Sequence, residues 1–276
     1  MAAFQREHAY VAQALDPSSI PAHKLAENQL ATPTNLALYA AATTGDFDGL
    51  TVALAAGGNP NWYNKSEDGA TALHKAACVG HVGCIELLLR NGAVIDERLL
   101  TNSNSPLHLA CGNGHLKAAE TLIAASAAVN TGNSYGNAPI HSALIGGHRA
   151  IVEMLLENGA DVKWTNNKGS SLLHFLAYSS MATKDKKALA SKLLEAGVNI
   201  DAKASGYEYL RLTPLHVVGQ SGDKDMGTFF LEQGADITIK DGEGKTPLQW
   251  AQLNSHSELG LLLAGGKKKA ETKVKK

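Results

Sequence analysis

Histidine is the residue type in this sequence with the most chemical potential, because an imidazole can bind a metal or transfer a proton near neutral pH. The chain has 11 histidines. Eight of them fall into two columns, which are His74, His108, His141, His174 and His216, and then His81, His115 and His148. A metal ion needs three or four ligands converging on one point, whereas residues recurring at a fixed interval each do the same task. The spacing therefore predicts a structural role, hydrogen bonding between neighbouring loops, and no metal or other cofactor.

A second chemical candidate is the segment GEGKT at residues 242–246, which resembles the end of a phosphate-binding loop. That motif requires glycine at position 239, where this chain has Ile239. The acidic Asp241 and Glu243 would also repel phosphate. We interpret the segment as a turn that leads into a helix.

The three cysteines, Cys78, Cys84 and Cys111, are an odd number without a CxxC pair and cannot form a disulfide framework. Their presence favours a reducing compartment, the cytoplasm or nucleus. No apolar stretch approaches the roughly 18 residues of a membrane span, so none is expected. Serine-hydrolase, zinc-protease and kinase motifs are missing from the sequence. We therefore predict a protein that is not an enzyme.

The elements that carry the histidines recur along the chain. Similar sequence motifs recur, namely TALHKAACVGH from Thr71, SPLHLACGNGH from Ser105, APIHSALIGGH from Ala138, SLLHFLAYS from Ser171, TPLHVVGQSGD from Thr213 and TPLQWAQLNSH from Thr246. Thr213 can cap a helix and Pro214 suits its first position. A second apolar phrase, such as AIVEMLLENGADV from Ala150, follows each time with helical spacing. Each unit is therefore expected to fold as helix, turn and helix, and to depend on its neighbours for burial.

Composition agrees with a modular chain rather than one large core. Aromatic residues make up only 5%, and 25 basic residues nearly balance 26 acidic ones. Such a balance gives no reason to expect specific nucleic-acid binding. The exception is the last ten residues, KKKAETKVKK, which hold six lysines and one glutamate.

From Leu36 to about residue 263 the sequence resembles the ankyrin repeat family, whose period is about 33 residues and whose signature is T-P-L-H-x-A. The resemblance implies an all-α solenoid with β-hairpin loops, a curved stack of helix-turn-helix units. We expect an N-terminal helical arm or cap over 1–35, with helices near 3–15 and 21–31. A repeat domain of about seven units should span 36–266, followed by a disordered lysine-rich tail over 267–276.

The resemblance also implies a function, the binding of a partner protein on the concave face. The family's variable positions place partner contacts at Glu67, Asp68, Asn104, Tyr135, Asn137, Ile145, Lys168, Tyr178, Tyr209 and Leu210. The aromatic and apolar members lie in the fourth to sixth units, and such residues are typical of interface centres. The alternative, that some of them pack against neighbouring loops, carries equal weight.

The fifth unit is irregular, since His174 and His216 are 42 residues apart whereas His108 and His141 are 33 apart. Five of the nine extra residues lie in or between its helices, with three lysines nearby, and four lengthen the next loop. These insertions either add specificity or are neutral.

These observations favour a non-catalytic adaptor or scaffold that is monomeric when free. Two alternatives remain, an assembly chaperone or inhibitor, and a peripheral tether that uses the basic C-terminal tail.

Overall fold

The computed structural model describes residues 31–204 and 211–274, with side chains as far as residue 266. The helices expected near 3–15 and 21–31, apart from Ala31, lie outside the described residues, as do Tyr209 and Leu210.

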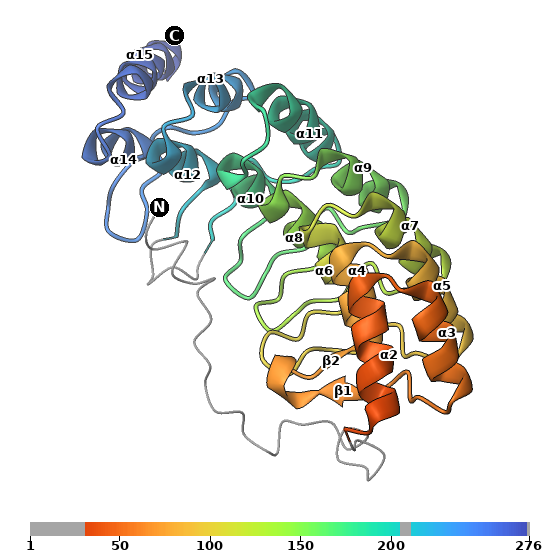
Figure 1. Ribbon diagram of the computed structural model, residues 1–276. Coiled ribbons are helices and arrows are strands. Elements are labelled where there is room, and N and C mark those ends of the chain that lie inside the picture. Colours follow the sequence, from red (N-terminus) through yellow and green to blue (C-terminus); the bar gives the residue numbers. More distant parts are fainter. Residues whose placement is uncertain (1–30, 205–210, 275–276) are drawn as a thin grey trace.

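The described helices form two rows in a curved array (Figure 1). The inner row lies next to the loops and comprises α2 (Pro33–Thr44), α4 (Ala72–Val79), α6 (Pro106–Gly112), α8 (Pro139–Gly146), α10 (Leu172–Tyr178), α12 (Pro214–Ser221) and α14 (Pro247–Leu253). The outer row lies on the convex side and comprises α3 (Phe47–Ala55), α5 (Val82–Arg90), α7 (Leu116–Ala124), α9 (Arg149–Glu157), α11 (Thr183–Glu195), α13 (Lys224–Glu232) and α15 (Ser257–Val274). We number the units 1 to 7 in the order of their inner helices.

Local sequence explains where the inner helices begin and end. Proline occupies the first turn of α6, α8, α12 and α14, where its missing N–H is not needed. Glycine ends several of them in the left-handed conformation, for example Gly80 with φ of 87°. This sharp ending lets each outer helix fold back against its inner partner.

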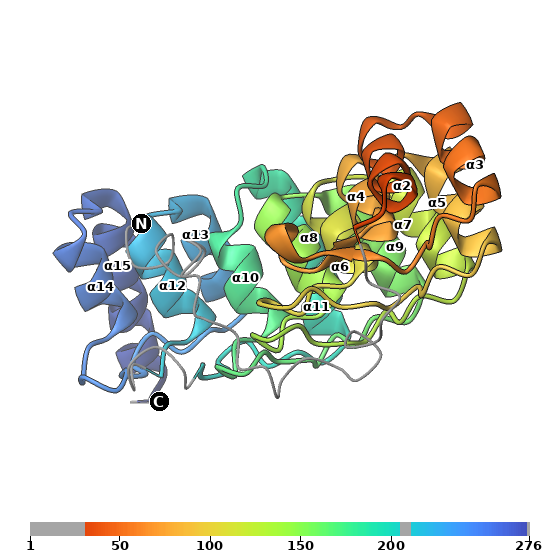
Figure 2. The same cartoon turned by 60° about the horizontal axis from the view of Figure 1, so that its bottom comes forward.

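Long loops, which we call fingers, connect each outer helix to the next inner helix and gather along one side of the array (Figure 2). The finger of unit 2 contains a short antiparallel pair, β1 (Tyr63–Asn64) with β2 (Ala70–Thr71), joined by the 3-10 turn η4 (Lys65–Glu67). In unit 6 an antiparallel bridge joins Ala204 to Leu212. Regular sheet is therefore a minor part of the described chain.

A continuous layer of leucine and alanine between the two rows forms the core. It extends from Leu38 in unit 1 to Leu263 in unit 7, and alanine pairs such as Ala76 and Ala77 are fully buried. Small side chains here let adjacent inner helices approach closely. Burial is thus shared between neighbouring units, as the repeat pattern predicts.

Both ends of the array differ from the sequence expectations. The first helix begins at Pro33, earlier than Leu36, because Thr32 caps it by accepting a hydrogen bond from the Asn35 N–H at 3.1 Å. At the other end, α15 continues to Val274, whereas we expected disorder from residue 267. Lysine, alanine and glutamate all have high helix propensity, which the sequence reasoning neglected.

The first insertion in unit 5 lengthens an outer helix. α11 has 13 residues, whereas α9 has 9, and the added turn is at its N-terminus. Lys184 and Lys186 therefore lie in the outer row, away from the fingers.

Candidate functional site

The first histidine column lies at the start of the inner helices and is buried there. Each of these histidines is the third residue of its helix, and its Nδ1 accepts a hydrogen bond from the backbone N–H of the capping residue. The ring is therefore fixed at the point where a finger becomes a helix. Because Nδ1 accepts, Nε2 carries the proton and can donate.

Four of these five histidines connect one unit to the next finger. Nε2 donates to the backbone carbonyl of the following finger in four pairs, His74 to Asn104 at 3.3 Å, His108 to Asn137 at 2.9 Å, His174 to Leu212 at 2.9 Å and His216 to Lys245 at 3.1 Å. His141 differs, since its Nε2 is buried and has no hydrogen-bond partner. Its ring instead packs edge-on against Phe175, with centroids 4.7 Å apart.

Burial keeps this column neutral. It lowers the pKa of His108 and of His174 to about 4, and that of His141 to about 3. A buried ring that stays neutral near pH 7 and has at least one nitrogen bonded to the backbone is unsuited to act as an acid or base there. Among the described residues, no group of three or more histidine, cysteine or acidic side chains could hold a metal ion.

The second histidine column packs against the glycines that end the inner helices. His115 lies against Gly80 of the preceding unit and donates from Nε2 to the Cys78 carbonyl at 2.9 Å. His148 makes the same bond to the Gly112 carbonyl at 3.1 Å. The sequence analysis missed a fourth member, His256, which donates to the Gln220 carbonyl at 3.1 Å. Both columns are thus structural connections between units.

The segment at 242–246 is a turn, as the sequence predicts. The buried Asp241 carboxylate accepts hydrogen bonds from the backbone N–H groups of Glu243 and Lys245 and from the Trp250 indole. Lys245 forms an ion pair with Glu243. A carboxylate therefore occupies the centre of this loop, where a phosphate-binding loop needs free N–H groups.

The cysteines are unsuited to nucleophilic chemistry. Cys84 and Cys111 are buried, and burial raises the pKa of both thiols, so that they stay protonated. Cys78 is half-buried and accepts a hydrogen bond from the Asn113 amide at 3.5 Å.

Two of the predicted partner contacts join the fingers to one another, and a third is buried. Asp68 accepts from the Thr101 N–H at 2.7 Å and from its hydroxyl. The Asn104 side chain accepts from the Asn133 amide at 2.8 Å. Asn137 is buried, so the prediction that its side chain meets a partner conflicts with its position. A place in a variable loop does not reveal that a side chain faces the next finger.

Glu67 is exposed but belongs to a local cluster. Its carboxylate accepts from the Tyr39 hydroxyl at 3.0 Å and pairs with Lys75 at 2.9 Å. The Lys75 hydrogen bond lowers the Glu67 pKa, whereas burial and the nearby Glu67 raise that of Tyr39.

Other predicted contacts lie on the surface of units 4 and 5. Tyr135 at the finger tip is 48% exposed, and Ile145 on α8 is 38% exposed. Tyr178 ends α10 and, like Lys168 in the finger, is half-buried.

Charge separates the two rows of helices, a feature that the sequence analysis did not detect. In all seven described inner helices, Lys75 is the sole acidic or basic residue. Every outer helix carries at least one, as with Glu86 and Arg90 in α5. The concave helix edge of units 3 to 7 is therefore uncharged over the described inner helices. Counting charges separately in the first and second helix of each repeat would have revealed it.

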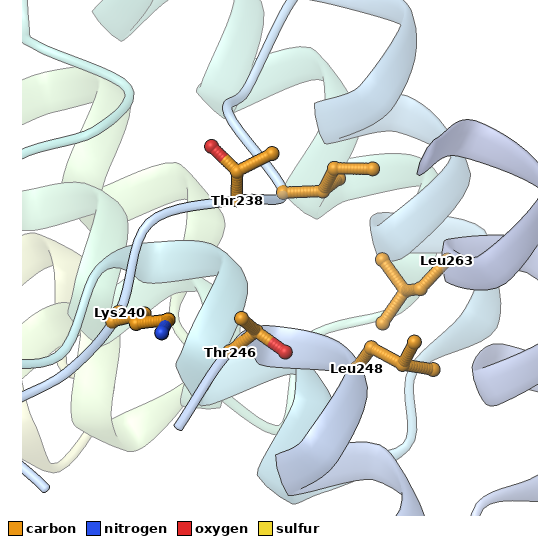
Figure 3. Close-up of a pocket in the computed structure, with 6 residues that line it drawn as sticks. Thr238, Lys240, Thr246, Leu248 and Leu263 are labelled. Carbon is orange, nitrogen blue, oxygen red and sulfur yellow. The ribbon is translucent and has the colours of Figure 1, made fainter. Parts of the chain in front are cut away.

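A cavity of about 190 Å³ lies at the last finger, lined by Ile237, Thr238, Lys240, Thr246, Leu248 and Leu263 (Figure 3). In four earlier fingers, the residue at the position of Thr238 accepts a hydrogen bond from the next finger. Examples are Asn61 from the Val94 N–H and Asn130 from the Asp161 N–H, both at 2.8 Å. The cavity therefore marks the end of the finger stack.

Comparison with known proteins agrees with this architecture. The family model for ankyrin repeats (3 copies) matches residues 1–99, 37–133, 95–166 and 173–276. The crystal structure of the human ASB11 ankyrin repeat domain superposes with a TM-score of 0.68 and 27% identity, covering 84% of this chain and 97% of that one.

Two curated relatives illustrate the range of the match. Human ankyrin repeat and SOCS box protein 16 is 34% identical over 215 residues, 78% of this chain and 40% of the relative. Mouse protein phosphatase 1 regulatory subunit 27 is 38% identical over 68 residues, 25% of this chain and 44% of the relative. The chain thus spans less than half the length of these relatives.

The two rows of helices, the repeated histidine caps and the stacked fingers define a helical repeat solenoid. The chain belongs to the ankyrin repeat family, whose repeats are modules of protein–protein interaction. None of the helices described is both long and apolar enough to cross a membrane.

Proposed function

We propose that this chain is a non-catalytic adaptor that binds one partner protein on the concave side of units 4 to 6. The observation that carries the proposal is that the inner helices of these units are uncharged. Ile145 projects from them with 38% of its surface exposed, and the finger of the same unit exposes Tyr135. Uncharged apolar and aromatic side chains lose little on desolvation, and interface centres are enriched in them.

Tyr178 on the next inner helix extends the proposed surface. Tyr209 and Leu210, which lie outside the described residues, remain predicted contacts. We assign lesser roles to Lys168, in the finger of unit 5, and to Glu67, in the finger of unit 2, as contacts that mainly exclude water from the centre. Asp68 and Asn104 join neighbouring fingers, and the Asn137 backbone carbonyl accepts a hydrogen bond from His108.

Site-specific photo-crosslinking tests the location directly. A photoreactive amino acid replaces Ile145 on the inner row in one variant and Ala124, an exposed residue at the end of α7, in a matched variant. We expect one partner to crosslink from position 145 and none from position 124. Equal crosslinking from both positions would contradict the proposal.

A truncation separates this proposal from the tether. If the lysine-rich tail mediates binding, removal of the residues after Gly266 abolishes it, and affinity falls steeply with salt. If the inner row mediates binding, the truncated chain keeps its affinity. Circular dichroism of the truncated chain controls for loss of α15.

A further inference from the structure

The junction between units 4 and 5 lacks the hydrogen bonds that join the inner row elsewhere. Nε2 of His141 has no partner, whereas the histidines of units 2, 3, 5 and 6 all bond the next finger. The cap of the same helix is Ala138, which has no hydroxyl, whereas Ser105 and Ser171 occupy that position in the adjacent units.

Two more buried polar atoms belong to the same region. The Asn137 Oδ1 has no partner, although the corresponding Asn104 Oδ1 accepts from the next finger. The Ser179 hydroxyl, at the end of α10, is also buried without one. Together with His141, these are the buried side-chain atoms without hydrogen bonds in the described chain. Each such group costs free energy, so this junction is weakened on its inner side.

The second histidine column is interrupted at the same place. Gly80 is covered by His115 and Gly114 by His148, each from the following unit. Both histidines donate a hydrogen bond back to a carbonyl of the preceding unit. At Gly147 the covering residue is the exposed Ser180. The insertion in unit 5 thus coincides with the loss of one inner connection.

The insertion supplies a different connection in the outer row. Asp185, in the added turn of α11, forms an ion pair with Arg149 of α9. Lys192 of α11 also pairs with Glu153 of α9 at 3.1 Å. These four side chains are between 27% and 55% exposed, so salt screens their attraction.

The next junction, between units 5 and 6, is better protected. Lys186 pairs with Asp223 at 3.1 Å with only 9% and 17% of the side chains exposed. His174 also keeps its bond to the Leu212 carbonyl. Salt should therefore act more on the junction between units 4 and 5 than on the junction between units 5 and 6.

We propose that the junction between units 4 and 5 is a salt-dependent hinge, held closed by the ion pairs of α11 with α9. When these pairs weaken, the outer helices separate while the fingers stay joined, through bonds such as that from the Trp164 indole to the Gly136 carbonyl at 2.8 Å. The hinge changes the curvature of the array between Ile145 and Tyr178. It follows from the contacts of this chain alone and does not depend on the proposed partner surface.

Distance measurements between spin labels test the hinge. Ala55, Ala124 and Glu195 are the last residues of α3, α7 and α11, and all three are exposed. Labels on unnatural amino acids at 124 and 195 span units 3 to 5, and labels at 55 and 124 span units 1 to 3. When the NaCl concentration is raised from about 0.05 M to about 1 M, we expect the distance distribution between positions 124 and 195 to shift to longer distances and to become about twofold broader. The distribution between positions 55 and 124 should stay unchanged.

Two variants assign the effect. Asp185→Asn should give the broad distribution at both salt concentrations, whereas Glu86→Gln, which removes an exposed pair within α5, should leave both distributions as they are. If Asp185→Asn does not fold, Lys192→Gln makes the same test on the second pair. Equal salt responses of the two label pairs, or a narrow distribution in the folded Asp185→Asn chain, would overturn the hinge.

Discussion

The inner and outer rows of this array have the same helical architecture but different surfaces. The outer row carries charges on every described helix, which pair locally, as Glu86 does with Arg90 at 3.3 Å. The inner row has Lys75 as its one charge and exposes Ile145. Since an exposed ion pair within one helix contributes little to stability, charges such as those of Glu86 and Arg90 mainly keep that face hydrated. Removing water from the inner face therefore costs little free energy, which favours binding at that face.

The two rows also differ in how they join neighbouring units. Buried neutral histidines bond backbone carbonyls along the inner row, whereas ion pairs join α9, α11 and α13 in the outer row. Acid should therefore act on the inner connections and salt on the outer ones.

The largest expected effect is acid destabilisation of the inner row. The pKa of His108 and His174 is about 4, and that of His141 about 3, whereas an unfolded histidine has an ordinary value near 6.5. Below pH 6.5 the unfolded chain binds protons that the folded chain does not, so the free energy of unfolding falls with pH. Each histidine should cost about 2 kcal/mol between pH 7 and pH 5.

Urea denaturation at pH 7 and pH 5 checks this, with His108→Gln as the control. That variant should lose about 2 kcal/mol less than the unmodified chain between the two pH values. A free energy of unfolding that stays constant over this range would show that the histidines are not buried as neutral rings.

The next effect distinguishes two histidines in the same column. Replacing His108 by alanine removes a bond to the Asn137 carbonyl and leaves a cavity, and should cost about 3 kcal/mol. His141→Ala leaves a similar cavity but removes no bond from Nε2, and should cost about 1 kcal/mol less. Thermal and chemical denaturation of both variants measure the difference. Equal losses would mean that His141 makes the same connection as the others.

Partner affinity should distinguish the rows next. Tyr135→Ala and Tyr178→Ala should each weaken binding by about 2 kcal/mol while leaving the melting temperature nearly unchanged. Lys117→Ala, on the outer α7 where the side chain is 79% exposed, is the matched control and should have no effect. Calorimetry with the crosslinked partner, with melting curves alongside, makes the comparison. Losses seen only in variants that also melt early would assign the tyrosines a structural role.

The smallest effect is expected in the outer row. Glu86→Gln removes the pair with Arg90, whose side chains are 74% and 47% exposed, and should change stability by less than about 0.5 kcal/mol. A loss above 1 kcal/mol in urea denaturation would show that outer pairs contribute more than their exposure implies.

The repeat period was enough to predict the fold, because a phrase such as TPLH specifies the cap, the first turn and the buried histidine together. It was also enough to exclude the segment around Asp241 as a phosphate site. Both conclusions depend on contacts within one unit or between identical positions of adjacent units.

The candidate site was less predictable, because its residues depend on what the neighbouring finger presents. Asp68 and Asn137 occupy variable positions, yet one binds Thr101 and the other is buried. One feature of the proposed hinge is visible in the sequence, because Ala138 replaces the serine or threonine found at the start of every later inner helix. The loss of the His141 bond is not visible there, because it depends on the path of the next finger.

The salt dependence of partner affinity tests the central claim most directly, since the uncharged inner helices of units 4 to 6 should bind without electrostatic attraction. Calorimetric titration of the partner at about 0.05 M and about 0.5 M NaCl gives one dissociation constant at each salt concentration. We predict that they differ by less than about threefold. A decrease in affinity of a hundredfold or more would show that binding uses charged surfaces, and would contradict the assignment of the partner site to the inner row.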